Sequence, residues 1–227
     1  MNLHALMSAR AASPVRVGLI GAGKFGAMFL AQVPHMPGVH VAAIADLRPD
    51  GARERLTAVG WEAGRAQARD LDEALATGGT WITDDADALI AAGPIEIVID
   101  ATGDPASGVA HALACFANGK HLVMVNVEAD ALVGPLLAQK AREAGVIYSL
   151  AYGDQPALIC EQVDWARACG MTVTAAGKGT RYRPEFHAST PDTVWTFYGL
   201  TPERARAAGM NPKMLDRKST RLNSSHT

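Results

Sequence analysis

Short apolar runs alternate along the first 150 residues with segments in which apolar side chains recur every three or four positions. Runs of this length that are rich in β-branched residues are typical of strands buried on both faces, whereas the wider spacing is typical of helices. We therefore predict six strands before residue 151, at positions 14–20, 39–45, 81–83, 95–99, 121–127 and 146–150.

The segments between these strands predict helices, several of which have proline at the start or glycine after the end. The expected helices are 1–12, 25–33, 49–60, 71–76, 84–91, 105–118 and 131–144. Strands that are apolar on both faces and separated by helices require a parallel sheet that is covered on both sides. Right-handed crossovers then make this sheet doubly wound, so the expected fold class is α/β with a Rossmann sheet.

The pattern changes after Tyr152, where polar, aromatic and turn-forming residues become frequent. A helix is expected at 157–169, a strand at 171–176 and a short helix at 202–209. These elements are too few to enclose a core of their own. We therefore expect them to be the start of a second domain, an α+β catalytic domain.

Composition narrows the class of protein. The chain of 227 residues is 48% hydrophobic and 19% charged, which excludes wholesale disorder. Its formal net charge of −2 gives no electrostatic reason to expect nucleic acid or an anionic membrane as a partner. No apolar run has the length of a membrane span, and three cysteines without a CxxC pair favour a reduced compartment. We therefore expect a cytoplasmic protein.

A glycine-rich turn follows the first predicted strand and opens the next helix. It matches the pattern GxGxxG, and in this context the pattern indicates a dinucleotide-binding loop. Its glycines allow a tight turn, a close approach of a pyrophosphate to the backbone, and close packing of helix on strand. The alternative is a glycine turn in an α/β protein that binds no nucleotide. The expected phosphate-binding residues are Gly21, Ala22, Gly23, Lys24, Phe25 and Gly26.

Asp46 and Arg48, which follow the second predicted strand, give opposite indications about the cofactor. Asp46 stands where a carboxylate accepts a hydrogen bond from the ribose 2′-hydroxyl of NAD. Arg48 has the planar guanidinium that suits the 2′-phosphate of NADP, although it is equally well explained as an exposed residue at a helix start. We therefore expect NADP or NAD, with use of both possible.

The carboxyl ends of the later strands supply further candidates, because ligands bind at that edge of a doubly wound sheet. Ala101, Thr102 and Gly103 are expected to lie against the nicotinamide ribose. Asn126 and Glu128 are two positions apart in a predicted strand, so both are expected to face the crevice. Glu128 could equally be a loop cap.

Asp154 and Lys178 are the remaining candidates for catalysis. Asp154 could orient a substrate hydroxyl or hold a metal ion, or it could cap the helix that follows. Lys178 stands between two glycines and could bind a phosphate or assist proton transfer at a carbonyl. Its alternative is a surface lysine in a turn. No metal-ligand spacing of the HxxxH or CxxC type occurs.

The chain contains the segments VGLIGAGKFG, IADLRP, VIDATGDP, VMVNVEAD, SLAYGDQPALICE and AAGKGT. Over residues 1–215, these six segments together resemble the homoserine-dehydrogenase-like oxidoreductases, and within them the deoxyxylulose-phosphate reductoisomerase-like group. The pairing of YGDQP with AAGKGT is the most specific part, because many families share the glycine motif.

The resemblance implies a nicotinamide-dependent oxidoreductase with a small hydroxy or carbonyl substrate, a separate catalytic domain and, at full length, a homo-oligomer. Some members of the group convert 1-deoxy-D-xylulose 5-phosphate to 2-C-methyl-D-erythritol 4-phosphate with NADPH and a divalent metal ion. The resemblance implies Lys178 and Asp154 as counterparts of the lysine and acidic residues near the nicotinamide. Two alternatives stay open: a regulatory module that senses NAD(P) without chemistry, and an inactive fragment.

Residues 216–227 have no periodicity, and Leu222 is their one aliphatic residue. The segment DRKSTRLNSSH matches the translation of a common sequencing-adapter sequence, so we expect this tail to be non-native. Members of the resembled group are also considerably longer. The expected organisation is therefore an N-terminal helix (1–12), an NAD(P)-binding Rossmann domain (13–155), an incomplete catalytic domain (156–215) and the tail (216–227).

Overall fold

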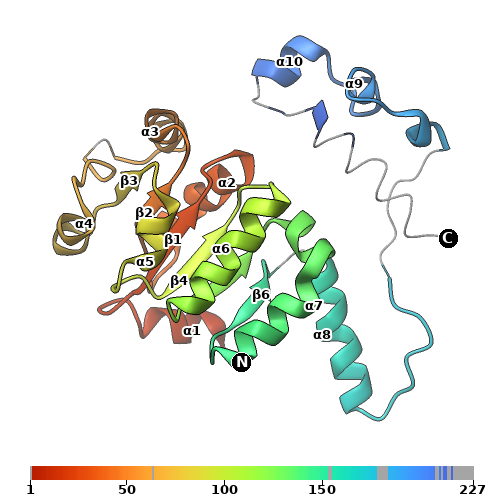
Figure 1. Cartoon of the computed structure of the whole chain (residues 1–227), viewed down its shortest axis with the longest axis horizontal. Helices are drawn as coiled ribbons and strands as arrows, with labels where there is room; N and C mark the ends of the chain where they lie inside the picture. Colours follow the sequence, from red (N-terminus) through yellow and green to blue (C-terminus); the bar gives the residue numbers. More distant parts are fainter. Residues whose placement is uncertain are drawn as a thin grey trace. The chain divides into compact units, whose positions relative to one another are not determined.

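The computed structural model describes residues 2–62, 64–152, 155–177, 184–207, 210, 212–213 and 216. The chain divides into two compact units, Met1–Leu158 and Ile159–Thr227. In the first unit, six parallel strands form one sheet in the order β3-β2-β1-β4-β5-β6 (Figure 1). The order turns back between β1 and β4, as in a Rossmann sheet, so the predicted fold class is confirmed. The strands are β1 (Val15–Ile20), β2 (Val39–Ala45), β3 (Trp81–Thr83), β4 (Ile97–Asp100), β5 (His121–Met124) and β6 (Tyr148–Leu150).

Helices cover both faces of this sheet (Figure 1). The side of α2 and α3 forms one apolar core, to which β1 contributes Leu19. The side of α5, α6 and α7 forms the other, to which β1 contributes Ile20. Because neighbouring strand residues point to opposite faces, the buried part of this central strand, residues 17–20, carries no polar side chain. The helices are α1 (Leu3–Ser8), α2 (Lys24–Gln32), η1 (Val33–His35), α3 (Pro49–Ala58), α4 (Leu71–Thr77), α5 (Ala86–Ala91), α6 (Pro105–Ala117) and α7 (Val127–Glu143).

The strands end in register at one edge of the sheet. Ile20 pairs with Ala45 on one side and with Asp100 on the other, and Asp100 pairs with Met124. The loops that follow β1, β2, β4 and β5 therefore meet at the same edge. This alignment places the glycine loop, Asp46 and the segment after β4 beside one another.

The predicted strand at 121–127 is too long. β5 ends at Met124, and α7 begins at Val127, earlier than the helix predicted from residue 131. The backbone of Val133 leaves the helical region, with φ −142° and ψ 18°, two residues before Pro135. Proline removes a helix hydrogen bond and its ring clashes with the carbonyl group four residues earlier, here that of Ala131, so α7 is two helical segments joined at a kink.

The second unit is small, and its described residues contain helices and irregular segments. Its elements are the end of α8 (Gln155–Ala168), η2 (Pro184–Ala188), α9 (Val194–Phe197) and α10 (Pro202–Ala207). The backbone at 171–177 is irregular, so the strand predicted at 171–176 is wrong. Val194, Trp195 and Ala205 are buried and form a small cluster of their own.

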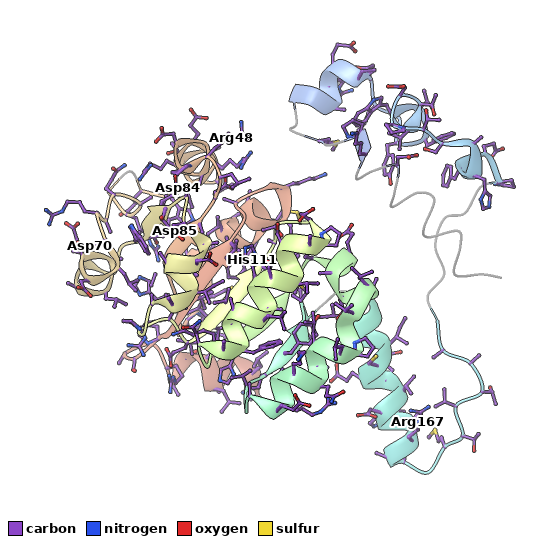
Figure 2. The ribbon with its side chains drawn as sticks, in the orientation of Figure 1. Arg48, Asp70, Asp84, Asp85, His111 and Arg167 are labelled. Atoms are coloured by element: carbon purple, nitrogen blue, oxygen red, sulfur yellow. The ribbon has the colours of Figure 1, made fainter. Side chains whose placement is uncertain are left out.

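Aspartate side chains cap the start of three helices of the first unit, and at α6 Asp104 accepts a hydrogen bond from Ser107 N. Asp70 accepts a hydrogen bond from Glu73 N at the start of α4, and Asp85 accepts one from Ala88 N at the start of α5 (Figure 2). All three are helix N-caps, which satisfy backbone donors that lack a partner in the helix. Among the described residues, no helix combines the length and apolar character that crossing a membrane requires.

Lys120 is a buried cation that closes the loop between α5 and β4. Its side chain is 5% exposed, and its Nζ donates to the carbonyl oxygens of Ala92 at 2.7 Å, Ile95 at 2.8 Å and Gly93 at 3.2 Å. Burial lowers the pKa of Lys120. The three carbonyls explain why the lysine is retained there, since an unpaired buried cation would be costly.

Replacing Lys120 with methionine should lower the free energy of unfolding by about 2–3 kcal/mol, because the buried carbonyl oxygens lose their shared donor. Urea denaturation followed by circular dichroism measures this loss. Lys140→Met is the matched control, since Lys140 is exposed on α7. Equal losses in the two variants would contradict a structural role for the Lys120 ammonium.

Candidate functional site

The glycine loop joins β1 to α2. Gly21 has φ +92°, and a Cβ on it would lie 2.9 Å from the carbonyl oxygen of Ala101. A Cβ on Gly26 would collide with the carbonyl oxygen of Gly21. A Cβ on Gly23 would meet nothing within 4 Å. Gly23 is the N-cap residue of α2, and no side chain accepts a hydrogen bond from the first backbone N–H groups of this helix there. Two glycines are thus required by the fold, whereas the third leaves open space at a helix N-terminus.

Asp46 connects the end of β2 to this loop. Its Oδ2 accepts a hydrogen bond from Ala22 N at 2.9 Å, and its Oδ1 accepts one from Arg48 N at 2.9 Å. Arg55 of α3 donates from Nη1 to the carbonyl oxygen of Ala22 at 2.9 Å. The same Nη1 lies 3.8 Å from Asp46 Oδ2. The side chain of Arg48 is exposed at the start of α3 (Figure 2).

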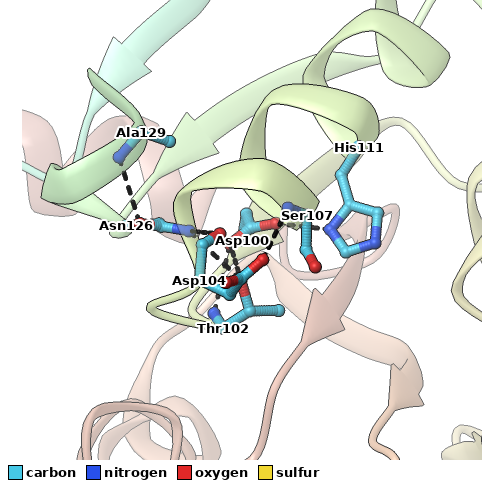
Figure 3. Close-up of polar contacts among 7 residues, drawn as sticks. All are labelled: Asp100, Thr102, Asp104, Ser107, His111, Asn126 and Ala129. Atoms are coloured by element: carbon cyan, nitrogen blue, oxygen red, sulfur yellow. Dashed lines mark hydrogen bonds and ion pairs between the residues drawn. The ribbon is translucent and has the colours of Figure 1, made fainter. Parts of the chain in front are cut away.

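A buried carboxylate organises the segment after β4 (Figure 3). Asp100 has no exposed side-chain surface, and its Oδ1 accepts from Thr102 N at 3.1 Å and Thr102 Oγ1 at 2.8 Å. Its Oδ2 lies 2.6 Å from Nδ1 of His111 on α6. Since an ionised carboxylate only accepts, this ring nitrogen carries the proton. The pair fixes the loop after β4 against the helix that follows it.

Asn126 joins this loop to the next helix (Figure 3). Its Nδ2 donates to the carbonyl oxygen of Asp104 at 2.7 Å and to Thr102 Oγ1 at 3.2 Å. Its Oδ1 accepts from Ala129 N at 3.2 Å, which makes Asn126 the N-cap of α7. The amide therefore bridges two loops at the carboxyl edge of the sheet.

The prediction that Asn126 and Glu128 share one face of a strand is wrong, because the strand has ended and Glu128 lies in the first turn of α7. Glu128 is nevertheless only 9% exposed. Within the described part of the chain, its carboxylate has no hydrogen-bond or ion-pair partner. Its carboxylate oxygens are not among the buried, unpaired atoms of the described residues, so they reach solvent at the edge of the sheet where ligands bind, and this position makes Glu128 a candidate for chemistry.

Two other titratable groups of the first unit are held neutral. Burial raises the pKa of the Cys115 thiol to about 12, with the charge of Asp100 adding to the effect. Tyr148 donates to Asp130 Oδ1 at 2.7 Å, and burial together with this bond raises the pKa of Tyr148 far above its ordinary value. Neither group can exchange a proton readily near neutral pH.

The structure brings most of the predicted cofactor residues together. The glycine loop touches Asp46 through Ala22, and Gly21 lies against Ala101 at the start of the segment that continues through Thr102 and Gly103. Asp154 and Lys178 lie outside the described residues. Among the residues that the structure describes, no group of three or more histidine, cysteine, aspartate or glutamate side chains could hold a metal ion.

Sequence reasoning missed Asp100, His111 and Arg55. The signal for the first two was present: a strand that ends in aspartate is followed by an otherwise apolar helix that carries a histidine. A polar ring on the buried face of such a helix needs a partner, and the strand-end carboxylate is near. Arg55 gave no comparable signal, because its spacing along α3 does not reveal which carbonyl it reaches.

Comparison with known proteins gives two family matches. The model of the homoserine dehydrogenase NAD binding domain matches residues 21–150, and that of the catalytic domain of oxidoreductase DRL matches residues 153–218. The comparison with curated proteins gives no match.

Similar solved structures come from several oxidoreductases. One is an NAD binding oxidoreductase from Klebsiella pneumoniae, at 22% identity, covering 69% of this chain and 39% of that chain, with a TM-score of 0.46. Another is a homoserine dehydrogenase from Thiobacillus denitrificans, at 23% identity, with coverages of 61% and 29% and a TM-score of 0.44. A third is a biliverdin reductase from Synechocystis in complex with biliverdin and NADP+, at 26% identity, with coverages of 62% and 38% and a TM-score of 0.41. The chain therefore spans less than half the length of each of these proteins.

The first family match takes in the glycine loop from Gly21, Asp46 and the network of Asp100, His111 and Asn126. It covers more than half of the 227 residues. The chain belongs to the family of the homoserine dehydrogenase NAD binding domain.

Proposed function

We propose that the chain binds NAD or NADP and belongs to an oxidoreductase that transfers a hydride to or from a small hydroxy or carbonyl substrate. The observation that carries this proposal is the open space at Gly23. That glycine begins α2, where backbone N–H groups lack helix partners and the helix dipole favours an anion. A pyrophosphate fits a cradle of this kind, because no side chain occupies it.

We propose roles for the other predicted cofactor residues as well. Lys24 and Phe25 offer first-turn N–H groups to the pyrophosphate, and Asp46 and Arg48 lie where the adenosine ribose would be held. Residues 101–103 would support the nicotinamide ribose at the crevice. When bound, the nicotinamide supplies or accepts the hydride, whereas the chain orients it and excludes water.

We propose Glu128 as an acid–base residue of this reaction, because it lies in the first turn of α7 at the carboxyl edge of the sheet and its carboxylate has no partner in the described part of the chain. The resemblance to homoserine dehydrogenases and to reductoisomerase-like enzymes adds Lys178 and Asp154 as groups that polarise or protonate substrate oxygens. The match of residues 153–218 to the DRL catalytic domain supports a substrate site beyond α7. A reductoisomerase-like reaction is the more specific form of this proposal.

Titration of the chain with NADH and NADPH tests cofactor binding. The four tryptophans provide a fluorescence signal for energy transfer to the reduced nicotinamide. We expect saturable binding with a dissociation constant in the range of about 1–100 μM, as is usual for such sites. The absence of saturation up to about 1 mM would contradict the proposal. Binding without hydride transfer to any hydroxy acid, amino alcohol or sugar phosphate would instead favour a dinucleotide-sensing module.

Glu128→Gln should lower turnover about 100-fold or more on a substrate that the wild-type chain converts, because the amide cannot exchange the proton. The dissociation constant for the dinucleotide should stay within about twofold of the wild-type value. A change of this size is well below the tenfold change that corresponds to 1.4 kcal/mol. Steady-state kinetics and the fluorescence titration measure the two quantities. Glu143→Gln, at an exposed position of the same helix, is the control. Undiminished turnover in Glu128→Gln would remove Glu128 from the reaction.

A further inference from the structure

Arg55 occupies an unusual place beside the glycine loop. It lies in the second half of α3, yet its guanidinium reaches back to the carbonyl oxygen of Ala22 at 2.9 Å. It also lies 3.8 Å from the Asp46 carboxylate. The side chain of Arg55 is 35% exposed and that of Asp46 only 14%, so water screens this pair less than a surface pair.

The Asp46 carboxylate faces the protein more than the solvent. One oxygen accepts from Ala22 N and the other from Arg48 N, and Arg55 lies beside the first. A carboxylate at the end of the second strand normally disfavours a 2′-phosphate through charge repulsion, since both groups are anionic. Two backbone donors and a guanidinium reduce the negative field that Asp46 projects toward the ribose.

We infer that Arg55 determines the dinucleotide specificity of the chain, by neutralising Asp46 so that NADP is accepted alongside NAD. The inference rests on the proposed function. Arg55 is a positioning residue, which acts through Asp46 without touching the dinucleotide. Its bond to the Ala22 carbonyl supports the glycine loop and so affects both dinucleotides alike, whereas its charge affects only the one that carries a 2′-phosphate.

The ratio of the dissociation constants for NADPH and NADH separates these two effects. In Arg55→Met, we expect this ratio to rise about tenfold, which corresponds to about 1.4 kcal/mol of lost electrostatic compensation. Arg55→Lys keeps a positive charge and should retain most of the wild-type ratio. Arg53→Met is the control, because Arg53 pairs with the exposed Asp50 on the same helix.

The Asp46→Asn background shows whether Arg55 acts through the carboxylate. With that charge removed, adding Arg55→Met should change the ratio by less than about threefold, well short of a 1.4 kcal/mol effect. A full tenfold change in this background would mean direct contact with the phosphate and would overturn the inference. So would an equal weakening of both dinucleotides in Arg55→Met, which indicates loop support alone.

Failure of the proposed function would look different, because the wild-type chain would then bind neither dinucleotide. Thermal unfolding of each variant shows whether it is folded. If Arg55→Met does not fold, Arg55→Gln supports the same comparison, since glutamine keeps a polar side chain at this partly exposed position and removes the charge. An unchanged ratio in Arg55→Gln would also overturn the inference.

Discussion

Replacing Asp100 with alanine is expected to destabilise the first unit by about 3–5 kcal/mol, because it leaves three partly buried donors without an acceptor. The carboxylate has no exposed surface and accepts three hydrogen bonds, two from Thr102 and one from His111. All three donors lose their acceptor at once. Urea denaturation measures the loss as a shift in midpoint.

Asp84→Ala is the matched control, since Asp84 is exposed at the end of β3 (Figure 2) and its removal should cost less than about 0.5 kcal/mol. His111→Ala should cost less than Asp100→Ala, because the two Thr102 bonds survive in that variant. If Asp100→Ala is no more damaging than Asp84→Ala, the network of Figure 3 contributes nothing to folding. A loss in His111→Ala equal to that in Asp100→Ala would place the whole effect in their shared bond.

The sheet could be predicted from the sequence because local patterns decide it. Runs such as residues 41–45 are apolar at every position, which excludes an exposed face, and the glycine loop marks the turn between the first strand and helix. The boundary between β5 and α7 could not be predicted in this way. Residues 121–127 remain apolar enough for a strand, and the switch to helix depends on Asn126 as the N-cap of α7. Two local preferences compete there, and contacts with Asp104 and Thr102 favour the cap.

The strand predicted at 171–176 fails for a different physical reason. The segment MTVTAA has high β-propensity, but a strand needs a neighbour with which to exchange hydrogen bonds. Its backbone is irregular in the structure. The β-propensity of this segment alone therefore gave a wrong prediction, because a strand forms only where it can pair with another strand.

The candidate site shows the same division between local and long-range information. The roles of the glycines follow from backbone geometry within a few residues, and sequence spacing is enough to assign them. The pairs Asp100–His111 and Asp46–Arg55 join a strand end to a helix face. Which face points inward depends on the packing of the whole helix, so spacing alone does not reveal these pairs.

Gly23→Val should raise the dissociation constant for either dinucleotide more than 100-fold, about 2.7 kcal/mol, and leave the free energy of unfolding unchanged. These two outcomes are expected together because a Cβ at Gly23 would meet nothing within 4 Å in the protein itself. The added side chain would fill only the space that a pyrophosphate requires. The backbone at Gly23, with φ −66° and ψ −161°, is open to any residue.

Two further glycines separate ligand exclusion from a folding defect. Gly93→Val is the matched control, because a Cβ there also meets nothing within 4 Å and the loop lies before β4, away from the carboxyl edge of the sheet. It should change neither dinucleotide binding nor stability. Gly26→Val should unfold the protein, since a Cβ there collides with the Gly21 carbonyl. If Gly23→Val binds NADH and NADPH as tightly as the wild-type chain, the space at the start of α2 is not a phosphate site, and the proposed function loses the observation that carries it.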